Sequence, residues 1–398
     1  MLVLTNLYPN PLQPHLAPWN RAQLRALSAR NEIQVISPIL WTEELSARRR
    51  TARRMAAGRR SSCDGIPVEH PRYLYPPKVL RGTYGNCYLW SVGRAFRRSV
   101  HAFRPDVIYS SWAYPDGWAA VRLSLRAAIP VVVKVHGSDI TTLAQFPGRL
   151  RRTVDALQHA DKVVAVSQDL ASEVVTLGVP EANVEVVYNG LDTKVFSPGS
   201  RTEARARLGL PNDVPAILFV GNLVPVKQVE TLIAACAALK SADTRFHCHL
   251  VGDGPLREAL AASIGRLALP ACVTLHGQRP QHQLADWYRA ANVVVLPSRS
   301  EGIPNVLLEA TACGTPFVAS NVGGIAEIAA DPRSRLVAPG DVKVFTDAIR
   351  HLLEDGNTPT ELVSDSALSW EKSAADLEQV LLAAVRQREE RPVPVVSI

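Results

Sequence analysis

Short apolar runs alternate with longer amphipathic stretches along this chain. Five-residue runs at 131–135 (VVVKV), 216–220 (AILFV) and 292–296 (NVVVL) predict strands that are buried on both faces. Segments of helical length follow such strands, for example 168–177 and 281–290. Strands that alternate with helices pair in parallel through crossover connections. We therefore expect an α/β protein with two Rossmann-like, doubly wound parallel-sheet domains.

The most informative stretch lies in the last third of the chain. The strand at 292–296 is followed by a polar loop, Ser298–Pro304. The next segment, Asn305–Cys313, is apolar around most of its circumference, which predicts a helix packed against the sheet, with Gly314 at its C′ position. A second strand is expected at 315–319, and another short helix is expected to begin at Glu327, after Gly323 and Gly324. The stretch therefore predicts one parallel α/β crossover.

Two carboxylates frame the loop and the helix of this crossover. Glu301 lies in the loop at the carboxyl end of the strand, and Glu309 lies one to two turns inside the helix. Ligands of open α/β sheets bind at the carboxyl ends of strands, and a helix N-terminus attracts phosphate. A loop carboxylate that binds hydroxyls beside such a terminus suits a nucleotide sugar. Taken alone, Glu309 is better explained as a solvated helical glutamate, but its apolar neighbours leave little of this helix exposed and weaken that interpretation.

The spacing Glu301-x7-Glu309, in the form EGIPNVLLEA, resembles the signature of the retaining glycosyltransferases of family 4, which have the GT-B fold. Two further runs support the resemblance, GNLVPVK at 221–227 and VGGIAE at 322–327. It implies two Rossmann-like domains that face a cleft, and closure of the domains would complete the site.

The resemblance also implies where the domains begin and end. The run NGLDTKVFSP at 189–198 looks like the interdomain segment of the family. An acceptor-side domain is therefore expected over 1–195, and a nucleotide-sugar-binding domain over 196–367. The run SWEKSA is similar to the element that crosses back to the first domain, so 368–398 is expected to form a returning helix and a tail.

Individual residues acquire roles from the resemblance. The run HGSDI matches the family's H-G-x-D, so His136 would contact the donor sugar, with Asp139 close by. Glu301 would hold sugar hydroxyls, Glu309 ribose hydroxyls and Lys227 the diphosphate. The expected catalytic residues are His136, Glu301 and Lys227. The expected donor-binding residues are Gly221, Asn222, Lys227, Gly277, Ser298, Glu301, Gly302, Ile303, Pro304, Asn305 and Glu309, and those expected near the cleft are Asp139, Asn189 and Asp253.

The implied reaction moves a sugar from a nucleoside diphosphate, UDP or GDP, to a glycan or lipid-linked acceptor with retention at the anomeric carbon. A front-face mechanism fits, in which the leaving phosphate takes the acceptor proton. We expect no cofactor and no metal, because the chain has no convincing D-x-D triplet. The run HCH at 247–249 also places Cys248 on the strand face opposite both histidines.

Two positions depart from the pattern of the family. The loop after the first strand carries prolines at 9, 11, 14 and 18 and no glycine, whereas relatives carry glycines there. Asn222 stands where relatives usually carry arginine. These departures favour one alternative, a catalytically impaired nucleotide-sugar-binding protein with the GT-B fold. A second alternative with the same fold is a sugar-nucleotide epimerase. The combination of Glu301, Glu309 and Lys227 argues against the epimerase.

Charge is divided unevenly along the chain. Residues 1–190 hold 24 Lys and Arg against 14 Asp and Glu, whereas residues 191–398 hold 20 against 23. The basic run Arg48–Arg60 is explained either as a solvated charged segment or as a docking site for anionic lipid, which Arg94, Arg97 and Arg98 could extend. We expect a peripheral contact with an anionic membrane. Nucleic acid is not expected, because no nucleic-acid motif accompanies the charge.

Composition adds limits on class and compartment. A chain of 398 residues, 47% hydrophobic and 20% charged, is long enough for two domains with full cores. No run of 18 apolar residues occurs, and the first ten residues read as a strand rather than a signal peptide. The six cysteines form no C-x-x-C pair, which is typical of a reducing compartment. We expect a cytoplasmic protein, peripheral on the inner face of the plasma membrane, that acts in exopolysaccharide, lipopolysaccharide or glycolipid synthesis.

Overall fold

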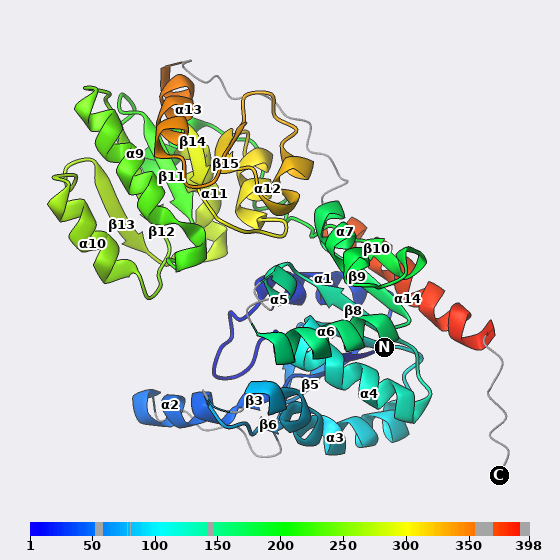
Figure 1. The fold of residues 1–398 in the computed structure, drawn as a ribbon. Helices are drawn as coiled ribbons and strands as arrows, with labels where there is room; N and C mark the ends of the chain where they lie inside the picture. Colours follow the sequence, from blue (N-terminus) through cyan, green and yellow to red (C-terminus); the bar gives the residue numbers. More distant parts are fainter. Residues whose placement is uncertain (52–58, 78, 80, 142–145, 355–368, 391–398) are drawn as a thin grey trace, which may run out of the picture. The chain divides into compact units, whose positions relative to one another are not determined.

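The computed structural model describes residues 1–51, 59–77, 79, 81–141, 146–354 and 369–390. The chain forms two compact units (Figure 1). Unit 1 comprises Met1–Gly190 together with the segment from Trp370 onward, and unit 2 comprises Leu191–Ser369. The chain therefore leaves unit 1 once and returns to it through its last helix. The sequence predicted these boundaries at 196 and 368.

Unit 1 is built on an eight-stranded sheet with the order β10-β9-β8-β7-β1-β2-β5-β4. All neighbours are parallel except β4 and β5, and the strand order reverses at β1, between β7 and β2. A second, two-stranded parallel sheet joins β3 and β6. The strands are β1 (Leu2–Leu4), β2 (Gln34–Ile36), β3 (Ile39–Leu40), β4 (Arg60–Cys63), β5 (Ile66–Glu69), β6 (Arg72–Tyr73), β7 (Ile108–Ser111), β8 (Val131–Val135), β9 (Lys162–Ala165) and β10 (Val184–Val186).

Helices cover both faces of the unit 1 sheet (Figure 1). Alternate strand residues point to opposite faces, so Val133 packs with α3, α4, α6 and α7, whereas Val132 packs with α1 and α14. This is the doubly wound arrangement that the sequence predicted. The helices are α1 (Pro18–Leu27), α2 (Trp41–Thr51), η1 (Arg81–Thr83), α3 (Tyr84–Phe103), η2 (Ala113–Gly117), α4 (Trp118–Ala127), α5 (Ser138–Thr141), α6 (Pro147–His159), α7 (Gln168–Thr176), η4 (Glu181–Asn183) and α14 (Trp370–Glu390).

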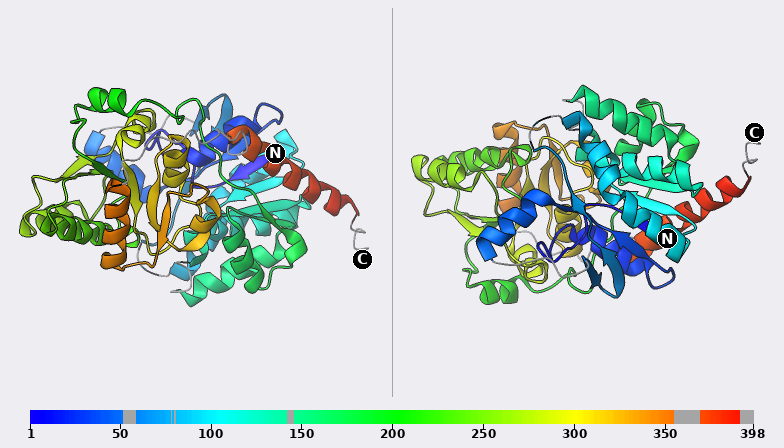
Figure 2. Two further views of the ribbon diagram at one scale, coloured as in Figure 1. Left: turned by 90° about the horizontal axis from the view of Figure 1, so that it is seen from above. Right: turned by 90° about the horizontal axis from the view of Figure 1, so that it is seen from below.

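The returning helix α14 is part of the core of unit 1. Figure 2 shows it beside α1, and Leu377 and Leu381 are buried in one cluster with Leu24. A polar chain joins the same elements, because Gln23 Nε2 donates to Ser373 Oγ at 2.9 Å. The Ser373 hydroxyl in turn donates to the main-chain oxygen of residue 188 at 2.6 Å. Helix α14 therefore completes one face of the unit 1 sheet.

Unit 2 is built on a six-stranded parallel sheet with the order β13-β12-β11-β14-β15-β16, around one buried cluster. The strand order reverses at β11, between β12 and β14, which is where open α/β sheets bind ligands. The strands are β11 (Ala216–Val220), β12 (His247–Val251), β13 (Val273–Gly277), β14 (Val293–Leu296), β15 (Phe317–Ser320) and β16 (Arg335–Val337). The helices are α8 (Arg201–Leu208), η5 (Pro225–Lys227), α9 (Val229–Ser241), α10 (Arg257–Arg266), α11 (Gln281–Ala290), α12 (Asn305–Ala312), η6 (Gly323–Ile328) and α13 (Val342–Glu354).

Several element predictions are confirmed to the residue, including β8, β11 and α11. One is wrong: Glu327 does not begin a short helix but lies near the end of the 3-10 turn η6. The chain has already turned at Gly323, whose φ is +56°, and Ile325 fills the core before Glu327 is reached. Within the described residues, no helix is long and apolar enough to cross a membrane.

Candidate functional site

The loops after β11, β12 and β13 approach one another through glycines at the carboxyl edge of unit 2. Gly252 N donates to the carbonyl oxygen of Gly277 at 2.9 Å. A Cβ on Gly252 would lie 1.8 Å from the oxygen of Gly221, and a Cβ on Gly254 would lie 2.5 Å from that of Leu223. Larger residues do not fit at these positions, so main chain rather than side chain forms this edge.

An ion pair joins the two loops that flank the switch point of unit 2. Lys227, at the end of η5, donates from Nζ to Oε1 of Glu301 at 2.6 Å. The two side chains are 21% and 10% exposed, so the pair is largely shielded yet open on one side. Main chain supports it, because Arg299 N donates to Val226 O at 2.8 Å. The structure thus brings together two of the residues predicted to be catalytic.

The run VGGIAE packs on the same loop. A Cβ on Gly323 would lie 2.0 Å from the carbonyl oxygen of Glu301, and the positive φ of Gly323 independently favours glycine. Gly324 N donates to the oxygen of Gly302 at 3.1 Å. The two glycines therefore fix the backbone that presents the Glu301 carboxylate.

Glu309 faces the interior from α12. Its side chain is almost fully buried, and Tyr288 Oη donates to its Oε2 at 2.7 Å. Burial raises the pKa of Glu309 to about 7, against the lowering effect of the Tyr288 hydrogen bond. Tyr288 is itself held in place, because Thr315 Oγ1 donates to its carbonyl oxygen at 2.7 Å. The interpretation of Glu309 as a solvated helical glutamate is therefore wrong.

The other residues predicted to bind the donor differ in accessibility. Gly221, Gly277, Gly302 and Asn305 are partly exposed and Asn222 is exposed, so main chain or side chain is open to a ligand at each. Ser298, Ile303 and Pro304 are buried and shape the loop from below. Asp253 is exposed, and its carboxylate accepts from Gly254 N at 2.8 Å.

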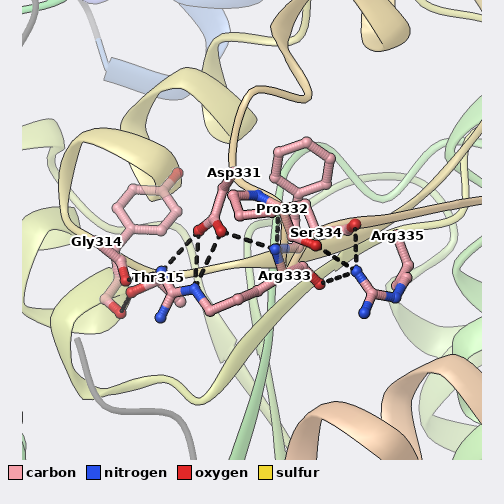
Figure 3. Close-up of polar contacts among 9 residues, drawn as sticks. Gly314, Thr315, Asp331, Pro332, Arg333, Ser334 and Arg335 are labelled. Atoms are coloured by element: carbon pink, nitrogen blue, oxygen red, sulfur yellow. Dashed lines mark hydrogen bonds and ion pairs between the residues drawn. The ribbon is translucent and has the colours of Figure 1, made fainter. Parts of the chain in front are cut away.

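A tight turn before β16 supports the far end of α12 (Figure 3). The Arg333 guanidinium donates to both carboxylate oxygens of Asp331, with the shortest distance 2.6 Å. Its Nη2 also donates to the carbonyl oxygen of Gly314 at 3.1 Å, just after the end of α12. Asp331 is nearly fully buried, so this pair anchors the helix that carries Glu309.

In unit 1, His136 follows β8 and is held by a directed chain of hydrogen bonds. Asn20 Nδ2 donates to Leu7 O at 2.8 Å, which orients the amide. Its Oδ1 accepts from the Ser111 hydroxyl at 2.7 Å, so Ser111 Oγ must accept from His136 Nε2 at 2.8 Å. Burial and the nearby Lys134 charge hold the pKa of His136 well below its ordinary value. The neutral ring therefore carries its proton on Nε2 and keeps Nδ1 as an acceptor.

Aromatic rings enclose the same histidine. Trp112 stacks on the His136 ring with centroids 6.0 Å apart, and Trp19 lies at 6.4 Å. Asp139 accepts from the main-chain N–H groups of His136, Gly137 and Ala113 at 2.9, 3.0 and 3.1 Å. Burial raises the pKa of Asp139 to about 6. Asp139 thus clamps the HGSD loop through its backbone.

Asn189 accepts from a fully buried lysine. Lys134 Nζ donates to Asn189 Oδ1 at 3.1 Å and to Gln23 Oε1 at 2.9 Å. Burial lowers the pKa of Lys134 to about 7. The Asn189 side chain therefore joins the polar chain that links α1 and α14, and this is its role in the structure.

The histidines of β12 gain a third partner, His276 of β13. His247 and His249 stack with centroids 4.6 Å apart, and His249 Nδ1 lies 3.0 Å from His276 Nε2. Cys248 faces the opposite side and is buried in the core, as the strand alternation predicted. The described residues contain no group of three or more His, Cys, Asp or Glu that could hold a metal ion.

Three residues of these sites escaped the sequence prediction: Tyr288, Ser111 and Asn20. Ser111 ends β7, the parallel neighbour of β8, so its position beside His136 follows once the strand order is known. The basic run Arg48–Arg60 lies largely outside the described residues. Of its members that are described, Arg59 pairs with Glu44 and donates to His70 O.

Two doubly wound units with candidate sugar- and phosphate-binding residues at their carboxyl edges define the GT-B class of glycosyltransferases. The folds of solved structures agree. Anabaena HepE in complex with UDP has a TM-score of 0.68 at 20% identity and covers 98% of each chain. Sucrose-phosphate synthase from Thermosynechococcus elongatus has a TM-score of 0.69 at 21% identity and covers 98% of this chain and 96% of its own.

The chain belongs to glycosyltransferase family 4. The model described as Glycosyltransferase Family 4 matches residues 25–195, and that described as Glycosyl transferases group 1 matches 200–367. A D-inositol 3-phosphate glycosyltransferase of Streptosporangium roseum is 32% identical over 74% of this chain and 73% of its own. The putative teichuronic acid biosynthesis glycosyltransferase TuaC of Bacillus subtilis is 29% identical over 88% of each chain.

Proposed function

We propose that this glycosyltransferase takes its sugar from a nucleoside diphosphate, with UDP favoured, and transfers it with retention and without a metal ion. The observation that carries the proposal is the Lys227–Glu301 pair at the switch point of unit 2. It offers one cation for the diphosphate and one carboxylate for sugar hydroxyls, with Lys227 Nζ and Glu301 Oε1 2.6 Å apart. UDP is favoured because the similar HepE fold has been solved with UDP and with UDP-glucose.

Each residue then has a defined task. The donor diphosphate displaces Glu301 from Lys227 and lies along the glycine edge of the unit 2 sheet. Glu301 turns to the sugar hydroxyls, and the Glu309 carboxylate accepts from the ribose. The bond from the anomeric carbon to the phosphate breaks, the acceptor oxygen bonds on the same face, and the leaving phosphate takes the acceptor proton. The neutral His136 orients the sugar through Nδ1.

A glycan or lipid-linked acceptor fits the pathways named for relatives. TuaC is assigned to teichuronic acid biosynthesis, and another similar fold is a lipopolysaccharide outer core galactosyltransferase. We place the reaction on the cytoplasmic side of the membrane, with peripheral attachment, and in polysaccharide or glycolipid synthesis. The six cysteines support a reducing compartment, since all of them are free thiols.

The test is nucleotide release from a panel of UDP-, GDP- and ADP-sugars, with and without a crude lipid acceptor. Wild type is expected to use one donor, and Glu309→Ala and His136→Ala are expected to lower turnover at least a hundredfold, about 3 kcal/mol in barrier. Glu230→Ala, an exposed position on α9, is the matched control and should keep full activity.

The same panel separates the alternatives, which the family matches do not favour. A binding protein would bind a donor and release no nucleotide under any condition. An epimerase would convert the nucleotide sugar without an acceptor. The proposal is abandoned if either pattern is found, or if release persists unchanged in Glu309→Ala.

A further inference from the structure

Helix α3 carries a basic stripe on its outward side. Trp90, Arg94, Arg97 and His101 follow one another at intervals of three or four residues, so they share one face of the helix. All four are exposed, whereas the opposite side, with Tyr88, Val92 and Phe96, packs in the core. Figure 1 shows α3 on the outer side of unit 1 next to β6 and α4.

Trp90 is unusual in this position. It is 73% exposed, more than any other large hydrophobic side chain among the described residues. Aliphatic side chains line the same hollow of the surface as Trp90: Leu74 after β6, which is 41% exposed, and Leu89 and Leu123. An exposed indole beside aliphatic groups has no role in the fold of unit 1, which already has two closed cores.

Two hollows flank the stripe and share Arg94 and Arg97. The larger, of about 790 Å³, is lined by both arginines together with Trp90, Arg72 and Arg126. The smaller, of about 520 Å³, lies on the side of Arg60 and Arg98 and also includes the carboxylate of Glu69. The larger hollow is therefore lined by four guanidinium groups and an indole.

Acidic partners compensate only part of this charge. Arg98 pairs with Glu69, and Arg72 pairs with Glu44 at 3.0 Å. No ion pair with Arg94, Arg97 or Arg126 occurs within the described part of the chain. Three uncompensated guanidinium groups around one hollow favour an anion, and arginine suits phosphate in particular.

We infer that this surface docks on an anionic lipid bilayer. It is formed by Trp90, Arg94 and Arg97 of α3 together with Arg126 of α4. Headgroup phosphates occupy the hollow, and Trp90 enters the interface, where indole rings concentrate. A single-stranded nucleic acid is less well matched, because successive bases need several stacking aromatics and this face offers one. The inference deepens the proposed function, on which it rests for a lipid-borne acceptor, and it uses none of the donor-site residues.

The experiment is vesicle flotation of the full chain without substrate. Vesicles are made of phosphatidylcholine alone or of phosphatidylcholine mixed with phosphatidylglycerol. Wild type should float with the anionic vesicles only. Arg94→Glu/Arg97→Glu should lower the partition coefficient about thirtyfold or more, because each basic residue near the surface contributes about 1 kcal/mol. Donor-dependent nucleotide release in solution should stay unchanged, which shows that the variant is folded.

The control and a second readout keep the inference testable. Arg25→Glu/Arg266→Glu changes the charge equally at exposed positions on α1 and α10 and should float like wild type. Brominated lipid should quench wild-type fluorescence, and Trp90→Phe should lose that component. Equal flotation of both double variants, or tighter binding to polyuridylate than to anionic vesicles, would refute the docking surface and leave the donor chemistry standing. If wild type floats with anionic vesicles but releases no nucleotide from any donor, the docking surface stands and the proposed donor chemistry is refuted.

Discussion

At the scale of the residue, the proton on His136 is set by groups that never touch a substrate. Removing the Ser111 hydroxyl frees Nε2 and lets the ring adopt either tautomer. We predict that Ser111→Ala lowers kcat about tenfold, about 1.4 kcal/mol, with a smaller change in donor KM, since one oriented hydrogen bond contributes about that much. Steady-state kinetics across pH provide the measurement.

The neighbouring residue Ser110 provides a control for Ser111→Ala. Ser110→Ala removes a hydroxyl that is equally buried, adjacent and without a hydrogen-bond partner among the described residues. Ser110→Ala should leave kcat unchanged. Ser111→Thr keeps the hydroxyl and should have the kcat of wild type. Equal losses of kcat in Ser110→Ala and Ser111→Ala would mean that the rate does not depend on the tautomer of His136.

Glu309 gives a prediction about pH. Its pKa is raised to about 7 by burial, so in the free enzyme it loses its proton between pH 6 and 8. In the proposed function the ionised form accepts ribose hydroxyls, so donor affinity should rise about tenfold per pH unit below about 7 and level off above it. Calorimetric titration with an intact nucleotide sugar measures this. Glu309→Gln should bind more weakly and independently of pH, and a pH slope that survives in Glu309→Gln would assign the titration to another group.

At the scale of the element, β12 and β13 carry an acid-sensitive histidine pair. Burial, with repulsion from His247, His276 and Arg205, lowers the pKa of His249 to about 3, and that of His276 falls to about 4. The unfolded chain binds these protons near pH 6.5, so the stabilisation is complete above that pH and is lost as the pH falls toward 3. Glutamine does not titrate. Between pH 7 and 4, the unfolding free energy of His249→Gln should therefore fall by roughly 2–3 kcal/mol less than that of wild type. Urea unfolding at several pH values tests it, and parallel curves for both proteins would contradict it.

The turn before β16 makes a second prediction at this scale (Figure 3). Arg333→Ala leaves the Asp331 carboxylate, whose side chain is 1% exposed, without its cation. We expect a loss of about 3 kcal/mol in unfolding free energy, as for other broken buried pairs. Arg335→Ala is the control, because its guanidinium donates only to main-chain oxygens of the same turn and should cost about 1 kcal/mol or less. Similar urea midpoints for the two variants would show that the pair does not anchor α12.

The sequence revealed elements better than it revealed contacts. Unbroken aliphatic runs such as AILFV predict buried strands directly, whereas β4 (RSSC) and β5 (IPVE) alternate too weakly to be recognised. Glu301 and Lys227 were found because each stands in a recognisable run. Asn20 and Ser111 are 91 residues apart in the sequence. The pairing of β7 with β8 brings Ser111 to His136, and Asn20 of α1 is joined to them through its hydrogen bond with Ser111. Polar residues of ordinary type carry no pattern that could predict such a contact.

At the scale of the whole molecule, α14 makes unit 1 discontinuous in sequence. Deleting residues 370–398 would remove Leu377, Val380 and Leu381 from the core and expose the strand face that they cover. At about 2 kcal/mol for each buried aliphatic side chain, the loss is comparable with the whole stability of a domain, about 5–15 kcal/mol. We predict an insoluble or unfolded product by gel filtration. A chain that stops after Glu390 should remain monodisperse, and a folded product from the larger deletion would show that unit 1 closes without α14.

The two junctions between the units have a practical consequence. Leu191 and Ser369, the first and last residues of unit 2, form a parallel bridge, so the ends of this unit lie side by side. Unit 2 is therefore an insertion in the sequence of unit 1, and its first and last residues are adjacent. If unit 2 binds the donor, as the proposed function has it, exchanging residues 191–369 for the matching segment of a relative should change the donor used and leave the sequence of unit 1 unaltered.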